Sequence, residues 1–289
     1  MNRQQVLERE RRWARVAGIC AIAVLPLFIL STYLEGSTAV FDFDVATERL
    51  RAADADSGQL LAAAALRGLS FLLYLPPLLY LFRAAQARSE RVSPAMVGFV
   101  FIGPVLFGAW VLVSNIAQSQ IAQDFVAQAA VGGDIYTMLD NLADDSSLAS
   151  IGSNLFFPAV LAILVAMIYV PLQAMRVGLL TRFFATLGMA LGASLLLITP
   201  QFSLLALSLW FAWLGFMILG RSPRGRPPAW ETGEAIPWPK PGEEPQAATA
   251  GAPADVVEGD ATEVFEPQPS KDQTARRERA RKKKRKRRA

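Results

Sequence analysis

Histidine is absent from this sequence of 289 residues, and cysteine occurs once. Without histidine, Ser-His-Asp and Cys-His catalysis, histidine-ligated haem and the common zinc sites are excluded. Cys20 alone cannot form an intramolecular disulfide or a multi-cysteine cluster, and its place in an apolar run favours the role of a small hydrophobe. Walker loops, dinucleotide fingerprints and GxSxG elbows are also missing. We therefore predict no catalytic residues, no cofactor and no metal site, and a protein that is not an enzyme.

Charged side chains are scarce in six apolar runs of 17–23 residues. This is the length that a helix needs to cross a hydrocarbon core of about 30 Å. The runs lack the alternation of an outer-membrane strand, and a helix satisfies its own backbone hydrogen bonds in lipid. The predicted fold class is therefore all-α, a polytopic transmembrane helix bundle of six spans with a disordered cytoplasmic C-terminal tail. The predicted spans are residues 16–34, 60–82, 96–117, 154–174, 183–199 and 202–219.

Positive charge is nearly missing from the loops expected on one side of the membrane. The third loop, residues 118–153, has no Lys or Arg, and the first loop has only Arg49 and Arg51. The opposite side carries 26 of the 29 basic residues. Because cytoplasmic loops are rich in Lys and Arg, we predict a multi-pass protein of the bacterial plasma membrane with both termini in the cytoplasm. An even number of spans follows, which supports splitting residues 183–219 at Pro200.

Arg67 is the single charged residue inside a predicted span. It lies 16 residues before Arg83, which marks the cytoplasmic end of the same span. That separation is about 24 Å of helix, so Arg67 is placed about 6 Å inside the outer boundary, where its side chain can snorkel to the headgroups. A structural role is favoured, and a contact to an anion or substrate is the alternative. No Asp or Glu lies in a span to pair with Arg67, so we do not expect a carboxylate proton relay in the membrane.

Small and helix-breaking residues interrupt two of the predicted spans. Gly188 and Gly192 form a GxxxG pair, a spacing that lets two helices approach closely. We favour packing inside the bundle, and dimerisation into a homo-oligomer is the alternative. Pro76 and Pro77 interrupt the second span, where we expect a plain kink rather than a transport site.

Two fragments, LLYLPPLLYLFRAAQARSER and AMRVGLLTRFFATLGMALG, carry a resemblance to a known type of protein. The chain resembles uncharacterised six-helix bacterial membrane proteins of an actinobacterial type. In these proteins a Leu/Tyr-rich second helix ends in a basic loop, and a GLL-x-R loop precedes a Gly-rich fifth helix. The resemblance covers about residues 16–220 and implies a six-helix fold, without implying an activity or site residues.

The C-terminal region changes composition sharply. Residues 221–270 are rich in Pro, Gly, Ala and Glu and are predicted to be a disordered linker, because they can bury little apolar surface. Residues 271–289 are a polybasic tail, while residues 1–15 form a basic cytoplasmic N-terminus and residues 16–220 the transmembrane domain. The residues predicted to contact a polyanion are Arg276, Arg277, Arg279, Arg281, Lys282, Lys283, Lys284, Arg285, Lys286, Arg287 and Arg288.

Two polyanions compete as partners of this tail. Anionic lipid headgroups of the inner leaflet attract each nearby basic residue by about 1 kcal/mol. RNA, including that of the ribosome, would bind through its phosphates, but without aromatic residues among the bases the tail has no stacking platform for reading a sequence. The predicted function is a non-enzymatic membrane tether or scaffold whose tail contacts anionic lipid or RNA. The alternative is a small transporter or channel-like protein with Arg67 near an outer vestibule.

Overall fold

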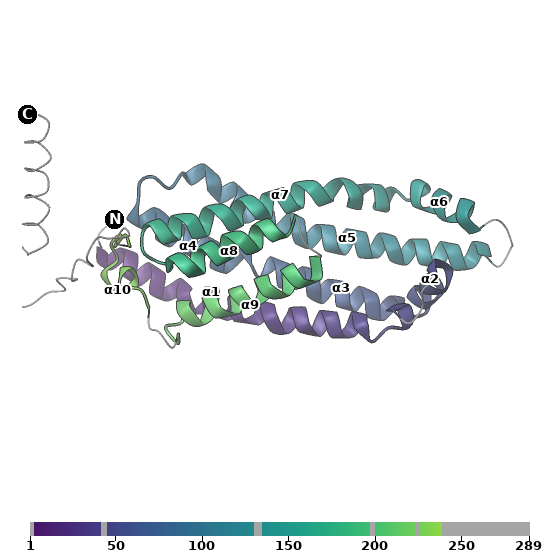
Figure 1. Ribbon diagram of the computed structural model, residues 1–289, viewed down its shortest axis with the longest axis horizontal. Helices are drawn as coiled ribbons and strands as arrows, with labels where there is room; N and C mark the ends of the chain where they lie inside the picture. The colour runs from purple at the N-terminus through teal and green to yellow at the C-terminus, as the bar shows by residue number, and fades with distance from the viewer. Residues whose placement is uncertain (1–2, 42–44, 130–134, 197–199, 223–225, 239–289) are drawn as a thin grey trace, which may run out of the picture. The chain divides into compact units, whose positions relative to one another are not determined.

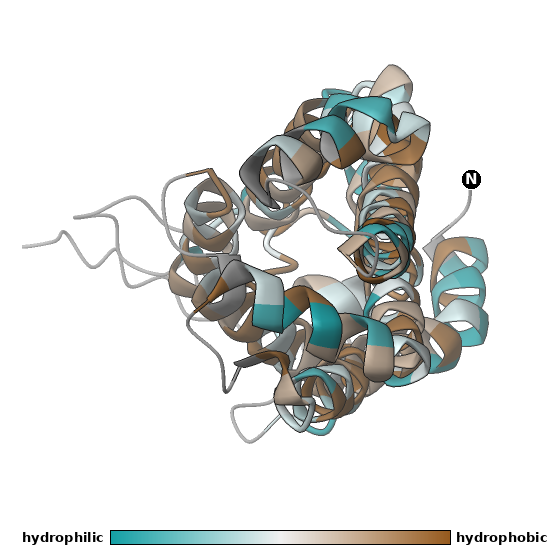
Figure 2. Ribbon diagram, turned by 90° about the vertical axis from the view of Figure 1, so that its right-hand side faces the viewer, coloured by the Kyte–Doolittle hydropathy of each residue, from teal (hydrophilic) through white to brown (hydrophobic). Residues whose placement is uncertain are grey.

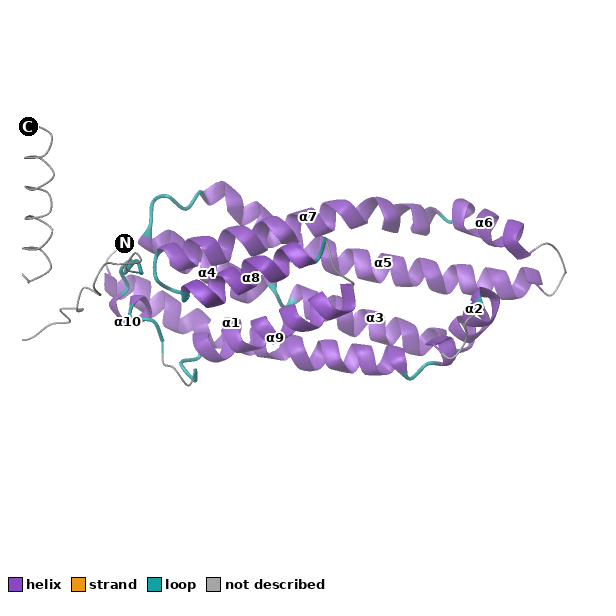
Figure 3. Ribbon diagram, in the orientation of Figure 1, coloured by secondary structure: helices purple, strands orange, loops and turns teal. Residues whose placement is uncertain are grey.

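The computed structural model describes residues 3–41, 45–129, 135–196, 200–222 and 226–238. All of these residues belong to one compact unit, residues 1–243. Every regular element in the described part of the chain is a helix, as Figure 3 shows. The all-helical fold class predicted from the apolar runs is therefore confirmed.

Four stretches of helix are long and apolar enough to cross a membrane: Gln4–Gly36, Ser57–Arg88, Pro94–Ala129 and Ser147–Arg176. They correspond to α1 (Arg3–Gly36), to α3 (Ser57–Leu72) with α4 (Leu75–Arg88), to α5 (Val97–Ala129) and to α7 (Ser147–Arg176). These helices lie side by side in Figure 1, with α5 against α7 and α3 between α1 and α5. The first four predicted spans lie within them.

The outer surface of the bundle is apolar as well as its core. Large apolar side chains on several helices face outward, including Ile19, Phe101, Phe157 and Trp213. Viewed along the bundle in Figure 2, the long helices carry brown residues around their ribbons and not on a single inward stripe. A helix that is apolar on all sides needs either a protein core or lipid around it. Together with the lengths of the helices, this surface indicates a membrane protein.

The fifth and sixth predicted spans form a shorter pair of helices. α8 (Arg182–Ser194) has 13 residues, about 20 Å of helix, which is less than the roughly 30 Å of a hydrocarbon core. α9 (Pro200–Ile218) has 19 residues, or about 28 Å. Residues 197–199 of the predicted fifth span lie outside the described residues. The structure therefore supports four spans, and the two further crossings remain a prediction.

The second predicted span is broken where its prolines lie. α3 ends at Leu72 and α4 begins at Leu75, so that Pro76 and Pro77 occupy the first turn of the new helix. This is the position at which a missing backbone N–H costs nothing. The buried Tyr74 fills the break, with its ring stacked on Phe211 of α9 at 4.1 Å between centroids. The predicted interruption is confirmed, and it is packed with aromatic side chains.

Glycines set the close crossings between the long helices. A Cβ added at Gly103 of α5 would lie 3.0 Å from the backbone of Ile163 in α7. A Cβ added at Gly215 of α9 would lie 2.6 Å from the carbonyl oxygen of Gly18 in α1. Because a methyl group at either position would force the facing backbone to shift, these crossings depend on small residues, as they commonly do between membrane helices.

The predicted outward loops contain helix as well. The helical spacing of Ile121, Phe125 and Ala129 predicts a short extension of the third span, and α5 does continue to Ala129. α2 (Ala46–Ala55) lies in the first predicted loop and α6 (Ile135–Asp145) in the third. Both lie at the end of the bundle where α1 ends (Figure 1). We call this end, which includes Glu35 of α1, the acidic end. We call the opposite end, which holds Arg83, Arg88, Arg176 and Arg182, the arginine end.

Candidate functional site

Arg67 lies near the acidic end, where its guanidinium pairs with a carboxylate of a neighbouring helix. Its Nη2 donates to Oε2 of Glu35, the second-last residue of α1. The guanidinium also lies over the ring of Phe28, 5.9 Å from its centroid. The side chains of Arg67 and Glu35 are 16 % and 29 % exposed, so both are largely shielded from solvent.

The sequence places no Asp or Glu within a predicted span, and the acidic partner that Arg67 has in the structure lies just outside one. Glu35 lies one residue beyond the predicted first span, which ended at Leu34, whereas α1 continues to Gly36. A carboxylate that pairs with the guanidinium neutralises most of the field that would attract an anion. The geometry thus favours the structural role of Arg67 over the contact to an anion or substrate.

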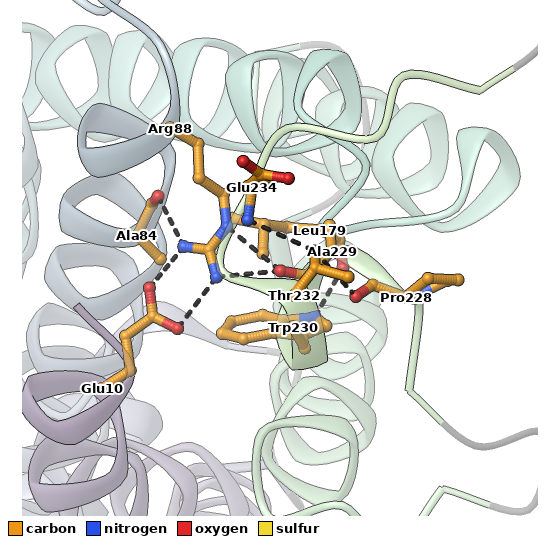
Figure 4. A network of polar contacts seen from close by, with 9 residues as sticks. All are labelled: Glu10, Ala84, Arg88, Leu179, Pro228, Ala229, Trp230, Thr232 and Glu234. Atoms are coloured by element: carbon orange, nitrogen blue, oxygen red, sulfur yellow. Dashed lines mark hydrogen bonds and ion pairs between the residues drawn. The ribbon is translucent and has the colours of Figure 1, made fainter. Parts of the chain in front are cut away.

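A second charge pair lies at the arginine end, where Arg88 closes α4 (Figure 4). Its guanidinium meets both carboxylate oxygens of Glu10 in α1, with Nη2 donating to Oε2 at 3.0 Å and Nη1 donating to Oε1. Nη1 also donates to the carbonyl of Ala84 at 2.9 Å, and Nη2 and Nε donate to the carbonyl of Ala229 at 2.9 and 3.2 Å. The Arg88 side chain is 0 % exposed. A planar fork of donors suits such a site, because every N–H of a buried guanidinium needs a partner.

The carbonyl of Ala229 belongs to a segment that folds back over the arginine end. We call this segment, residues 226–238, the strap; it contains the short helix α10 (Ala229–Thr232). The indole of Trp230 stacks on the ring of Tyr80 in α4, with centroids 5.5 Å apart and planes inclined by 8°. The Arg88 guanidinium lies 5.9 Å from the ring of Trp230, so one aromatic side chain links the strap to the charge pair.

The strap is held by the loop between α7 and α8. Trp230 Nε1 donates to the carbonyl of Leu179 at 2.9 Å, and Trp238 Nε1 donates to the carbonyl of Leu180 at 2.8 Å. The backbone N–H of Ile236 donates to the carbonyl of Val177 at 3.1 Å. These donors satisfy backbone carbonyls at the C-cap of α7, Val177, and in the loop that follows it. Gly178 allows the contact, because its φ is +79° and an added Cβ would lie 2.0 Å from the carbonyl oxygen of Ile236.

The strap corrects the predicted linker. Residues 221–270 were expected to be disordered, but residues 226–238 pack against α4 and the loop between α7 and α8 through Trp230 and Trp238. The prediction averaged the composition over fifty residues and gave these two indoles no weight. Two tryptophans in a proline-rich segment are the signal that could have indicated docking, because each brings a large apolar surface and one donor.

The other predicted site residues fall into two groups. Gly188 faces Trp210 of α9, and Gly192 faces Met167 of α7; an added Cβ at either glycine would lie 2.6 Å from the facing side chain. Both glycines thus lie in contacts within the bundle. The predicted polyanion-contacting residues, from Arg276 to Arg288, lie outside the described residues.

Neither charge pair has the composition of a catalytic or metal centre. Within the residues that the structure describes, no three His, Cys, Asp or Glu side chains come together to hold a metal ion. Each pair joins one cation to one anion, so that the two charges neutralise each other. Comparison of the chain with protein-family models, with curated proteins and with solved structures gives no match.

Proposed function

We propose that the chain is a non-enzymatic membrane tether, in which the helical bundle is the anchor and the polybasic tail holds anionic lipid. In this proposal the arginine end faces the cytoplasm, α8 and α9 complete six membrane crossings, and both termini are cytoplasmic. The basic residues that flank the long helices support this orientation, because the positive-inside bias counts Lys and Arg near the ends of spans.

The observation that carries the proposal is the attachment of the strap. Through Trp230, Ile236 and Trp238 the strap ties the chain to the arginine end, immediately before the remaining linker. The last described residue, Trp238, is therefore held at the arginine end of the bundle. Thirty-two residues separate Trp238 from Lys271, and a flexible chain of that length spans about 30 Å root-mean-square. The tail is then within reach of the membrane in which the bundle lies and of a second surface close to it.

Lipid is favoured over RNA as the partner because of this location. A basic run held near an anionic membrane is at high effective concentration for its headgroups, whereas RNA must be recruited from solution. At about 1 kcal/mol for each basic residue near the surface, eleven residues suffice for stable attachment after the cost of ordering them.

Vesicle capture tests the proposal. Full-length protein reconstituted in phosphatidylcholine liposomes should capture fluorescent vesicles that contain phosphatidylglycerol, and it should release them in high salt. Deletion of residues 271–289 should abolish capture. The matched control is deletion of residues 252–270, which removes the same number of linker residues and should preserve it.

Other outcomes contradict the proposal in defined ways. Capture that persists after deletion of the tail, or that is equal for neutral vesicles, would show that the tail does not hold anionic lipid. Binding of RNA at a salt concentration where no vesicle is captured would assign the tail to RNA. The transporter alternative has less support, because Arg67 is paired with Glu35 and lines none of the cavities described between α1 and α4, α5 and α7, or α8 and α9.

A further inference from the structure

A groove of about 340 Å³ lies between the first turns of α1 and the length of α4. Its apolar wall includes Trp13 and Val16 of α1 and Leu75, Pro76 and Leu79 of α4. Trp13 and Val16 are 60 % and 47 % exposed, so the groove is open to the surroundings of the bundle. An apolar groove between two membrane helices that is open to the outside of the bundle has the form of a binding site for an acyl chain.

Two arginines line the same groove. Arg9 of α1 and Arg83 of α4 are both exposed and contribute to its lining. They come from different helices, so the positive charge of the groove arises because α1 packs on α4. Two guanidiniums can share one phosphate, each offering a fork of N–H donors.

The carboxylate of Glu10 also lines the groove and would repel an anion if it were unpaired. Both of its oxygens are instead engaged by the buried guanidinium of Arg88. Arg88 thus neutralises the charge of Glu10. Glu10 therefore does not compensate the positive charges of Arg9 and Arg83. The groove has a net positive end and an apolar remainder.

The position of the groove along α1 matches the level of lipid headgroups. The sequence changes from arginine-rich to apolar at Val16, where the first predicted span begins. Arg9 lies on the polar side of this boundary, and the groove wall formed by Leu75 and Pro76 of α4 lies on its apolar side. The groove is therefore charged at one end and apolar at the other, as a phospholipid is. Trp13 lies between them, and indoles are enriched at membrane interfaces.

The geometry points to a binding site for one anionic phospholipid between α1 and α4, with Arg9 and Arg83 on the headgroup phosphate and the wall from Trp13 to Leu79 on an acyl chain. The site consists of residues of the bundle alone. It is therefore independent of the polybasic tail and goes beyond the tether function proposed above.

Thermal unfolding of the full-length protein in a neutral detergent tests this site, because a ligand that binds the folded bundle raises its unfolding temperature. Phosphatidylglycerol should stabilise the protein at lower concentration than phosphatidylcholine. Either Arg9→Gln or Arg83→Gln should raise the half-saturating concentration of phosphatidylglycerol about fivefold, and the double substitution should raise it about thirtyfold. The control Arg12→Gln/Arg15→Gln removes two exposed charges from the same helix, outside the groove, and should change it less than twofold.

The acyl chain is tested by two further comparisons. Trp13→Ala should weaken the stabilisation by phosphatidylglycerol several-fold. Glycerol phosphate, which has the anionic group without the chains, should stabilise the protein only at far higher concentration. Equal stabilisation by glycerol phosphate would show a plain phosphate site and overturn the assignment to lipid.

Three results would overturn the site itself. These are equal stabilisation by phosphatidylcholine, an unchanged response of the Arg9→Gln/Arg83→Gln variant, or an equal loss in the Arg12→Gln/Arg15→Gln control. The last result would mean that general positive charge, and not the groove, attracts the lipid. Vesicle capture by the tail and lipid stabilisation of the bundle are separate measurements, so either proposal can fail while the other stands.

Discussion

At the scale of single residues, Arg67 and Arg88 show how one residue type serves different ends of the bundle. Arg67 meets one carboxylate and one aromatic ring near the acidic end, and its side chain retains some exposure. Arg88 is fully enclosed and bonds to a carboxylate, to its own helix and to the strap. More segments meet at Arg88 than at Arg67, so more of the structure depends on Arg88.

Substitution of Arg88 should therefore be costly. Arg88→Gln leaves the Glu10 carboxylate without its cation and the Ala229 carbonyl without its donors, and breaking a buried pair in this way costs about 3–5 kcal/mol. We expect a large fall in the thermal unfolding temperature of the detergent-solubilised protein, and faster hydrogen exchange in the strap.

The matched control is Arg91→Gln, an exposed arginine three residues further along the chain, which should leave both measurements nearly unchanged. Similar behaviour of the two variants would mean that the contacts of Arg88 add little to stability. A loss of stability without faster exchange in the strap would separate the charge pair from the docking of the strap.

At the scale of helices, the bundle depends on places where two backbones nearly touch. α5 and α7 form the most extensive of the helix contacts, and they cross at Gly103 and Ile163. In lipid, such packing replaces much of the hydrophobic driving force that stabilises a soluble core. The contact should tolerate added volume poorly.

Two glycines of α5 allow a direct comparison. Gly103→Ala should lower the unfolding temperature, because the methyl group would press on the Ile163 backbone 3.0 Å away and overpacking costs about 1–3 kcal/mol. Gly98→Ala, in the first turn of the same helix, meets nothing within 4 Å and should be neutral or slightly stabilising, since Ala favours helix over Gly. Equal effects of the two substitutions would show that helix propensity and not the crossing decides the result.

At the scale of the whole molecule, the number of bilayer crossings depends on α8, α9 and the turn between them. Four helices have the length and composition, whereas α8 is short and the turn that follows it includes residues outside the described part. Six crossings require that this turn reach the far surface. If α8 and α9 instead form a hairpin that enters and leaves the membrane on the same side, the same sequence pattern gives four crossings.

Cysteine labelling in intact cells distinguishes these topologies. In a Cys20→Ser background, a membrane-impermeant maleimide added outside should label Glu48→Cys in α2 and should not label Arg91→Cys until the membrane is opened. Leu196→Cys, exposed at the turn after α8, should be labelled from outside if the chain crosses six times. Its resistance to the impermeant reagent, with reaction of an apolar maleimide, would indicate a hairpin that stays within the membrane. Labelling of Arg91→Cys from outside would reverse the proposed orientation.

The positions of the four long helices were predictable from local sequence. Apolar runs of sufficient length and the missing charge identify a membrane helix without knowledge of its neighbours. Helix ends were less predictable, as α1 shows by continuing to Gly36, beyond the predicted end of its span at Leu34. This error of a few residues concealed Glu35, and with it the partner of Arg67.

The strap and the Arg88 site were not predictable by the same means. Arg88 bonds to Glu10, 78 residues away, and to Ala229, 141 residues away. Composition describes a segment by its average, so a proline-rich stretch was assigned to disorder although two of its side chains dock. The lipid groove likewise joins Arg9 to Arg83, which only the packing of α1 on α4 brings together.

The amino-acid sequence is enough to establish that the chain is helical, that its helices suit a membrane, that Lys and Arg are spread unevenly among its loops and that histidine-dependent chemistry is absent. These properties follow from local composition and helix length. The packing of the folded chain sets which charges are paired, where the strap docks and where a positive groove opens. Each of these is a contact between distant segments, set by close packing of helices and by the need of every buried donor for an acceptor.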